Sequence, residues 1–161
     1  MTVVRTDINF LMRLLKKRLN SEKILETLEQ IGTDPELLDN ELVVEIYPNR
    51  PDMYSPEGIA RALRAYLEIS PGLPRFNVRN GDLKIIVEKS VLNIRPYIAG
   101  AVVRDVSLDE GSLESIMRLQ EALHDSYGRK RRRVAIGIHD LDKVTPPFTY
   151  RGISQDGVRF V

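Results

Sequence analysis

The first part of the chain carries apolar residues three and four positions apart, the spacing of a helix with one buried stripe. This spacing predicts a helix from Asp7 to Asn20, with the Asp7 side chain as its N-terminal cap. It predicts a second helix over residues 21–31, capped by Ser21. Gly32 then stands where a left-handed residue commonly ends a helix.

Residues 41–48, ELVVEIYP, alternate between apolar and polar positions. This alternation predicts a half-buried strand with Leu42, Val44 and Ile46 on its buried side. Residues 33–40, TDPELLDN, separate this strand from the preceding helix and are predicted to be a turn-rich connection.

A structural corner is predicted directly after this strand. It consists of Asn49, Arg50, Pro51 and Asp52. Proline removes a backbone donor and forces the preceding residue to be extended, so the strand must stop here. The arginine could also pair with a carboxylate or a phosphate. Ser55, followed by a proline suited to the first helical position, predicts the start of the next helix.

Residues 69–82 contain two prolines and two glycines without periodicity, and we interpret them as a linker. The elements predicted after it are strands 83–89 and 94–106, a helix from 108 to about 127 ended by Gly128, and strands 134–144 and 148–153. We therefore expect an α+β chain with domains at 1–75 and 76–161. The first is a small helix-rich unit with a short sheet, and the second is a mixed sheet with one long helix packed across it.

The C-terminal residues include Val158, Phe160 and Val161, which are apolar. Two interpretations stay open. The polypeptide is a piece of a longer one whose sheet is not yet closed, or a terminal strand docks onto the sheet.

Composition is that of a globular protein and excludes several classes. Of 161 residues, 42% are hydrophobic and 29% are charged, which excludes global disorder. The chain contains no cysteine, so disulfides and thiolate metal sites are excluded. The uncharged stretches are shorter than the roughly 20 residues of a membrane span. The N-terminus, MTVVRTDINF, lacks an apolar signal core, and we expect a cytoplasmic protein with no membrane partner.

Five consecutive cations are the clearest candidate for binding: Arg129, Lys130, Arg131, Arg132 and Arg133. Dense positive charge gains affinity for nucleic acid by releasing counterions, and the net charge of +1 means that such a surface must be local. The alternative is a solvated helix end, where cations oppose the helix dipole. Aromatic residues for base stacking do not interleave with the run.

Catalytic and metal-binding motifs are not found. His139, Asp140 and Asp142 offer potential ligands, but in a strand they point to different faces, and His124 is the only other histidine. The sequence contains no P-loop, GxGxxG, GxSxG or HExxH motif. We therefore predict no catalytic residue, no bound metal and no bound cofactor for this chain.

Three stretches together resemble a known family. They are NRPDMYSPEGIARAL at 49–63, IRPYIAGAVVRDV at 94–106, and GRKRRRVAIGIHDLDK at 128–143 followed by PPFTY. They are similar to the N-terminal part of the phenylalanyl-tRNA synthetase beta subunit in its archaeal and eukaryotic form.

The resemblance implies that the parent enzyme joins phenylalanine to tRNA(Phe) with ATP and Mg²⁺, as an assembly of two alpha and two beta subunits. It implies that aminoacylation belongs to the alpha subunit. The beta subunit would supply structure, tRNA contacts and an editing domain that removes tyrosine from tRNA. Residues 76–161 would begin that editing domain, whose pocket residues are not found in this sequence. We thus expect the chain alone to be inactive.

Two other functions stay open beside this one. The chain could be a stand-alone nucleic-acid-binding module that uses residues 129–133, or a protein-interaction scaffold. Salt-dependent binding of tRNA separates the scaffold from the other two.

Overall fold

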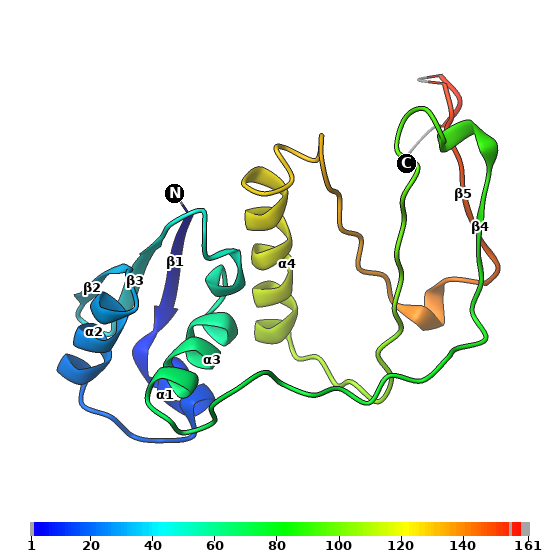
Figure 1. The fold of residues 1–161 in the computed structure, drawn as a ribbon. Coiled ribbons are helices and arrows are strands. Elements are labelled where there is room, and N and C mark those ends of the chain that lie inside the picture. The colour runs from blue at the N-terminus through cyan, green and yellow to red at the C-terminus, as the bar shows by residue number, and fades with distance from the viewer. Residues whose placement is uncertain (1, 155, 159–161) are drawn as a thin grey trace. The chain divides into compact units, whose positions relative to one another are not determined.

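The computed structural model describes residues 2–154 and 156–158, and its fold is α+β, as predicted (Figure 1). The chain divides into two compact units. Unit 1 comprises residues 1–75 and 108–136, and unit 2 comprises residues 76–107 and 137–161. Residues 108–136 thus group with unit 1 by their contacts, and the domains at 1–75 and 76–161 stay a prediction.

Unit 1 contains an antiparallel sheet with the strand order β1-β3-β2. The strands are β1 (Thr2–Asp7), β2 (Asp34–Leu38) and β3 (Glu41–Ile46). The predicted strand is β3, and the side chains of Leu42, Val44 and Ile46 are fully buried, as their alternation indicated. The predicted connection over residues 33–40 is wrong, because β2 forms there. Proline at position 35 is tolerated since β2 is an edge strand.

Helices α1 (Ile8–Leu15) and α2 (Ser21–Gln30) follow β1. Asp7 caps α1 as predicted, and its carboxylate accepts a hydrogen bond from the Phe10 amide at 2.8 Å. The predicted cap of α2 is one residue off. Asn20, not Ser21, accepts the hydrogen bond from the Glu22 amide at 2.8 Å. The reason is that Asn20 has the extended backbone that a cap requires, whereas Ser21 is already the first residue of the helix.

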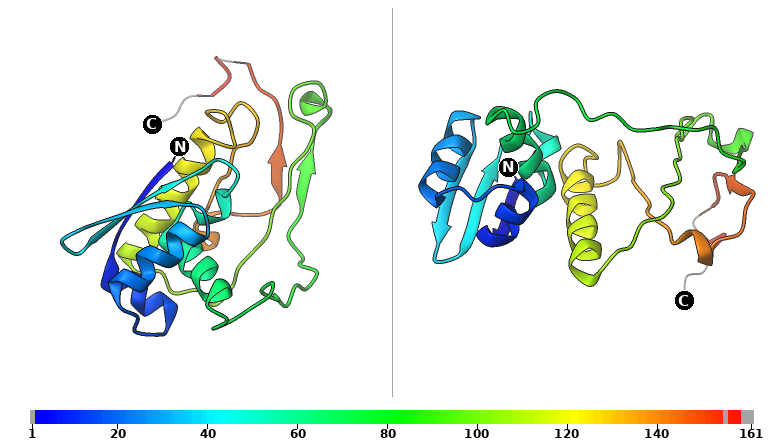
Figure 2. Two further views of the ribbon diagram at one scale, coloured as in Figure 1. Left: turned by 60° about the vertical axis from the view of Figure 1, so that its left-hand side comes forward. Right: turned by 90° about the horizontal axis from the view of Figure 1, so that it is seen from below.

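Helix α1 stops five residues before the predicted end, because Lys16 adopts a left-handed backbone with φ 55°. Gly32 has φ 84°, the left-handed geometry predicted after the second helix. Helix α3 (Pro56–Tyr66) begins as predicted, with the Ser55 hydroxyl accepting a hydrogen bond from the Gly58 amide at 3.1 Å. Helix α2 lies next to β2, and α3 contacts both α1 and α2 (Figure 2).

The core of unit 1 lies between its sheet and its helices. The largest fully buried apolar side chains are Leu11, Leu15, Ile24, Leu28, Leu42, Val44, Ile46, Met53, Ile59 and Leu63. The long helix α4 (Glu110–Asp125) adds Leu119, Ala122 and Leu123 to the edge of this core. This packing explains why α4 groups with unit 1 rather than with the sheet on which it was predicted to pack.

Unit 2 contains a parallel pair of short strands, β4 (Ile85–Val87) and β5 (Phe148–Tyr150). The Tyr150 hydroxyl donates to the carbonyl of Arg95 at 2.9 Å. The strands predicted over 94–106 and 134–144 do not form in these described residues. An alternating pattern indicates which side chains could share a face. A strand also needs hydrogen-bond partners for its backbone groups, and these two segments pair with none of the described strands.

Short 3-10 helices complete the described elements: η1 (Pro51–Met53), η2 (Lys89–Val91) and η3 (Leu141–Lys143). Within residues 2–154 and 156–158, every helix is too short or too polar to cross a bilayer.

Candidate nucleic-acid interface

The candidate interface begins where α4 ends. The helix starts at the Asp109 cap, whose carboxylate accepts from the Ser112 amide at 2.7 Å, and its last residue is Asp125. Gly128 follows, as predicted, close to the end of the helix. A Cβ at Gly128 would lie 2.6 Å from the Val134 carbonyl oxygen and 2.8 Å from that of His124. The backbone passes too closely here for any residue but glycine.

The residues 129–133, which we call the basic loop, leave the helix through a left-handed turn. Arg129, Lys130 and Arg131 have φ values of 48°, 55° and 63°, a conformation that costs free energy in residues other than glycine. Several backbone hydrogen bonds close the turn. The Gly128 amide donates to the Leu123 carbonyl at 2.7 Å, and the Arg133 amide donates to the Gly128 carbonyl at 2.8 Å.

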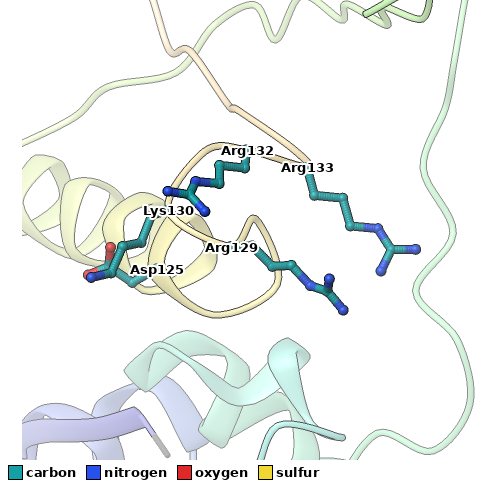
Figure 3. A pocket seen from close by; sticks show the side chains of 5 residues that line it. All are labelled: Asp125, Arg129, Lys130, Arg132 and Arg133. Atoms are coloured by element: carbon teal, nitrogen blue, oxygen red, sulfur yellow. The ribbon is translucent and has the colours of Figure 1, made fainter.

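The left-handed turn places the cations around an open depression of about 740 Å³. Its lining is Asp125, Arg129, Lys130, Arg132 and Arg133. Figure 3 shows the four cationic side chains spreading away from the loop in different directions. A surface with four cations and one carboxylate attracts anions. The predicted contact of residues 129–133 with RNA stays a prediction.

Arg131 is the cation of the basic loop that lies outside this lining. Its guanidinium Nη2 donates to both carboxylate oxygens of Glu121, at 2.5 Å and 2.6 Å. This hydrogen bonding, together with the positive charge of Arg131, holds the pKa of Glu121 below its ordinary value. The pair connects the loop to the last turns of α4.

His124 forms a hydrogen bond with the backbone at Ile136, which follows the basic loop. Its side chain is buried, and Nε2 accepts a hydrogen bond from the Ile136 amide at 2.8 Å. Because Nε2 is the acceptor, Nδ1 carries the proton of the neutral ring, and Nδ1 lies 3.4 Å from Glu121 Oε1. From the sequence, His124 was considered only as a metal ligand; its contact with Ile136 could not be predicted because it depends on the course of the backbone.

An aromatic side chain accompanies the basic loop in space, although none interleaves with residues 129–133 in the sequence. The Tyr127 ring lies under the guanidinium of Arg133, with Cζ 5.9 Å from the ring centroid. This is the geometry of a cation–π contact. Tyr127 precedes the run by two residues, and the left-handed turn brings Arg133 back over it.

The corner at residues 49–52 is held by hydrogen bonds from two arginine side chains. Arg50 donates from Nε and Nη2 to the two carboxylate oxygens of Asp52, both at 3.0 Å. Arg61 from α3 donates to the Asp52 carbonyl at 3.1 Å. The hydrogen bonds from Arg50 hold the pKa of Asp52 below its ordinary value and raise that of Arg50. Both cations are engaged within the protein here, and this engagement favours the structural interpretation over phosphate binding.

The acidic segment near residue 140 has a local structural role. Asp140 accepts a hydrogen bond from the Asp142 amide at 3.1 Å and so caps η3, and Lys143 lies 3.6 Å from Asp140. Among the described residues, no group of three or more His, Asp or Glu side chains could hold a metal ion.

No family model matches this chain, but curated relatives are similar to it over most of its length. The phenylalanine–tRNA ligase beta subunit of Methanosphaera stadtmanae is 41% identical over 100% of this chain and 29% of the relative. That of Methanocaldococcus jannaschii is 45% identical over 94% of this chain and 28% of the relative. The chain thus spans less than a third of the length of these relatives.

The fold has a match among solved structures. The crystal structure of an N-terminal fragment of the phenylalanyl-tRNA synthetase beta subunit from Pyrococcus horikoshii is 32% identical, with a TM-score of 0.81 over 92% of this chain and 45% of that one. Sequence and fold agree, and the chain belongs to the phenylalanine–tRNA ligase beta-subunit family, matching the N-terminal region of its archaeal members.

Proposed function

We propose that this chain supplies structure and a phosphate-binding surface to a phenylalanine–tRNA ligase, and that the basic loop holds tRNA(Phe). The observation that carries the proposal is the depression lined by Arg129, Lys130, Arg132 and Arg133. The net charge of the chain is only +1, so attraction of a polyanion must come from this local concentration of charge.

The mechanism is electrostatic positioning. A phosphate backbone carries condensed counterions, and cations that replace them gain free energy from their release. Such contacts fix the orientation of the nucleic acid and carry no direct sequence information. The basic loop would hold tRNA in place while the selection of phenylalanine occurs elsewhere in the enzyme.

The proposal extends to the whole enzyme through the family. Its partners would be the alpha subunit and tRNA(Phe), in a cytoplasmic assembly of two alpha and two beta subunits that consumes ATP. The described residues contain no cluster of three or more carboxylates and imidazoles that could hold a metal ion. Residues 76–161 would begin the editing domain, and the chain alone would neither charge nor edit tRNA.

Salt-dependent binding tests the proposal. The 161-residue chain is titrated into a fluorescein-labelled tRNA(Phe) transcript, and the Kd is measured by anisotropy. With four phosphate contacts, the affinity should fall about 50- to 150-fold between about 50 and 200 mM KCl. Replacing both Arg132 and Arg133 with Ala should weaken binding and flatten this dependence.

The control removes a cation elsewhere. Arg79 lies exposed in the linker, and Arg79→Ala should bind tRNA like the unchanged chain. Binding that ignores salt, or a double variant that binds as tightly as the control, contradicts the proposal.

One observation favours a protein-interaction role as a second function. Unit 2 exposes large apolar side chains, among them Ile94, Tyr97 and Val103, each more than three-quarters exposed. Exposed apolar groups gathered in one region commonly mark contacts with other polypeptide. Salt-independent capture of the alpha subunit by the chain, without tRNA binding, would favour this role over the first.

A further inference from the structure

We infer that the cations of the basic loop have two different tasks in binding the phosphate backbone of RNA. Arg131 is a positioning residue that holds the loop through Glu121, and the phosphate contacts belong to the four cations that line the depression. The inference rests on the proposed function and divides its binding site into a contacting and a supporting part.

The position of Arg131 supports the first task. Its Nη2 donates to both oxygens of Glu121 on α4, and its backbone amide donates to the His124 carbonyl at 3.3 Å. Side chain and backbone thus both connect Arg131 to the helix. The Glu121 carboxylate engages Nη2 of Arg131 and offsets the positive charge that would otherwise attract an RNA phosphate.

The loop needs such support because its conformation is costly. Three successive left-handed residues and five neighbouring cations both disfavour the observed turn. The Glu121–Arg131 pair, the His124–Ile136 hydrogen bond and the Arg133–Tyr127 contact oppose this cost. A surface that holds cations together in the absence of a ligand is preorganised for an anion, because the ligand then pays little to arrange them.

The chemistry of the depression indicates an extended phosphate ligand. It is open and about 740 Å³ in volume, and each side chain that lines it is charged, four of the five positively. The ring of Tyr127 carries Arg133 on one face and so supports a cation. We therefore assign to this site the sugar–phosphate backbone of RNA, with no base readout.

Two variants of the ion pair test the division of tasks: Arg131→Ala and Glu121→Gln. Both break the same pair and should weaken the binding of labelled tRNA(Phe) by a similar factor, about two- to fivefold, at every salt concentration. The slope of log Kd against log salt should stay unchanged. Arg129→Ala and Arg132→Ala should each reduce that slope by about 0.7 to 0.9, because each removes one phosphate contact.

Glu121→Gln gives the sharpest outcome, because the two explanations predict opposite signs. If Glu121 only repels RNA, removing its charge tightens binding. If it positions Arg131, the same change weakens binding. Glu121→Gln is also nearly isosteric, so it keeps the test decisive should circular dichroism show that Arg131→Ala is unfolded.

The failures of the two proposals are distinguishable. An Arg131→Ala variant that lowers the salt slope as much as Arg132→Ala, or a Glu121→Gln variant that binds more tightly, overturns the division of tasks and leaves the proposed function standing. If every loop variant binds like Arg79→Ala, the proposed function itself fails.

Discussion

Replacing Gly58 with alanine changes the free energy of unfolding in two opposite ways, through helix propensity and through packing. Gly58 is the third residue of α3, and in a helix alanine is favoured over glycine by about 1 kcal/mol. Propensity alone therefore predicts a more stable protein. Gly58 is buried, however, and faces the backbone of η1. A Cβ there would overlap the Asp52 carbonyl oxygen and lie 3.1 Å from both the Asp52 carbonyl carbon and the Met53 Cα.

The clash is costly because neither backbone can move freely. The Met53 side chain is fully buried, and Arg61 holds the Asp52 carbonyl from the next turn of α3. The new methyl group must push α3 away from η1, which disturbs the core in which Met53 and Ile59 are both fully buried. Overpacking of this kind costs about 1 to 3 kcal/mol, occasionally more. After the propensity gain of about 1 kcal/mol is subtracted, we expect a net loss in the free energy of unfolding of about 1 kcal/mol.

Urea denaturation followed by circular dichroism measures this change. With an m value of about 2 kcal/mol/M, the midpoint should fall by about 0.5 M. Gly111→Ala is the matched control, since Gly111 is the second residue of α4 and its Cβ would meet only Asp109 Oδ1, at 3.9 Å. That variant should gain about 0.5 to 1 kcal/mol. If Gly58→Ala is as stable as the unchanged chain while Gly111→Ala gains, the close approach of α3 to η1 is refuted.

Two further predictions concern the corner and the turn after α4. Because Arg50 lowers the pKa of Asp52, the folded state favours the carboxylate; this stabilisation is present above the unfolded pKa and is lost as pH falls through the folded pKa. Asp52→Asn should therefore cost less than about 1 kcal/mol near neutral pH, since the pair is partly exposed, and nothing in strong acid. A pH-independent difference in urea midpoints would contradict this. Gly128→Ala should cost about 1 to 3 kcal/mol, because the methyl group meets two carbonyl oxygens. Gly81→Ala, with open space around its Cβ, is the control, and equal thermal midpoints for the two variants would contradict the prediction.

The sequence was sufficient to predict elements whose signals are local. The Asp7 and Ser55 caps and the alternating strand β3 depend on side chains within a few residues of each other. The edge strands β1 and β2 were missed because they exist only through pairing with β3. Their own sequences carry a proline and several charged residues, which are typical of turns and equally of edge strands.

The opposite error arose in unit 2, where segments with strand-like sequences form no strand in the described part of the chain. Residues 94–106 are rich in apolar and β-branched side chains, yet their backbone pairs with neither β4 nor β5. Periodicity describes what a segment would bury if a partner were present. It does not supply the partner, and the strand predicted over residues 94–106 is therefore wrong.

The basic loop shows the same limit for the candidate site. Five adjacent cations are visible in the sequence, but a run of identical charges does not say which member faces a ligand. In a helix or strand, neighbouring positions would divide between faces by a fixed period. The left-handed turn follows neither period, and it sends Arg131 back to Glu121, ten residues earlier, while Arg133 reaches Tyr127. The distinction between contacting and supporting cations therefore depends on backbone angles that the residue types disfavour. The strain in those angles must be offset by the α4 contacts, so a substitution on the helix at Glu121 should change a binding surface that it does not itself line.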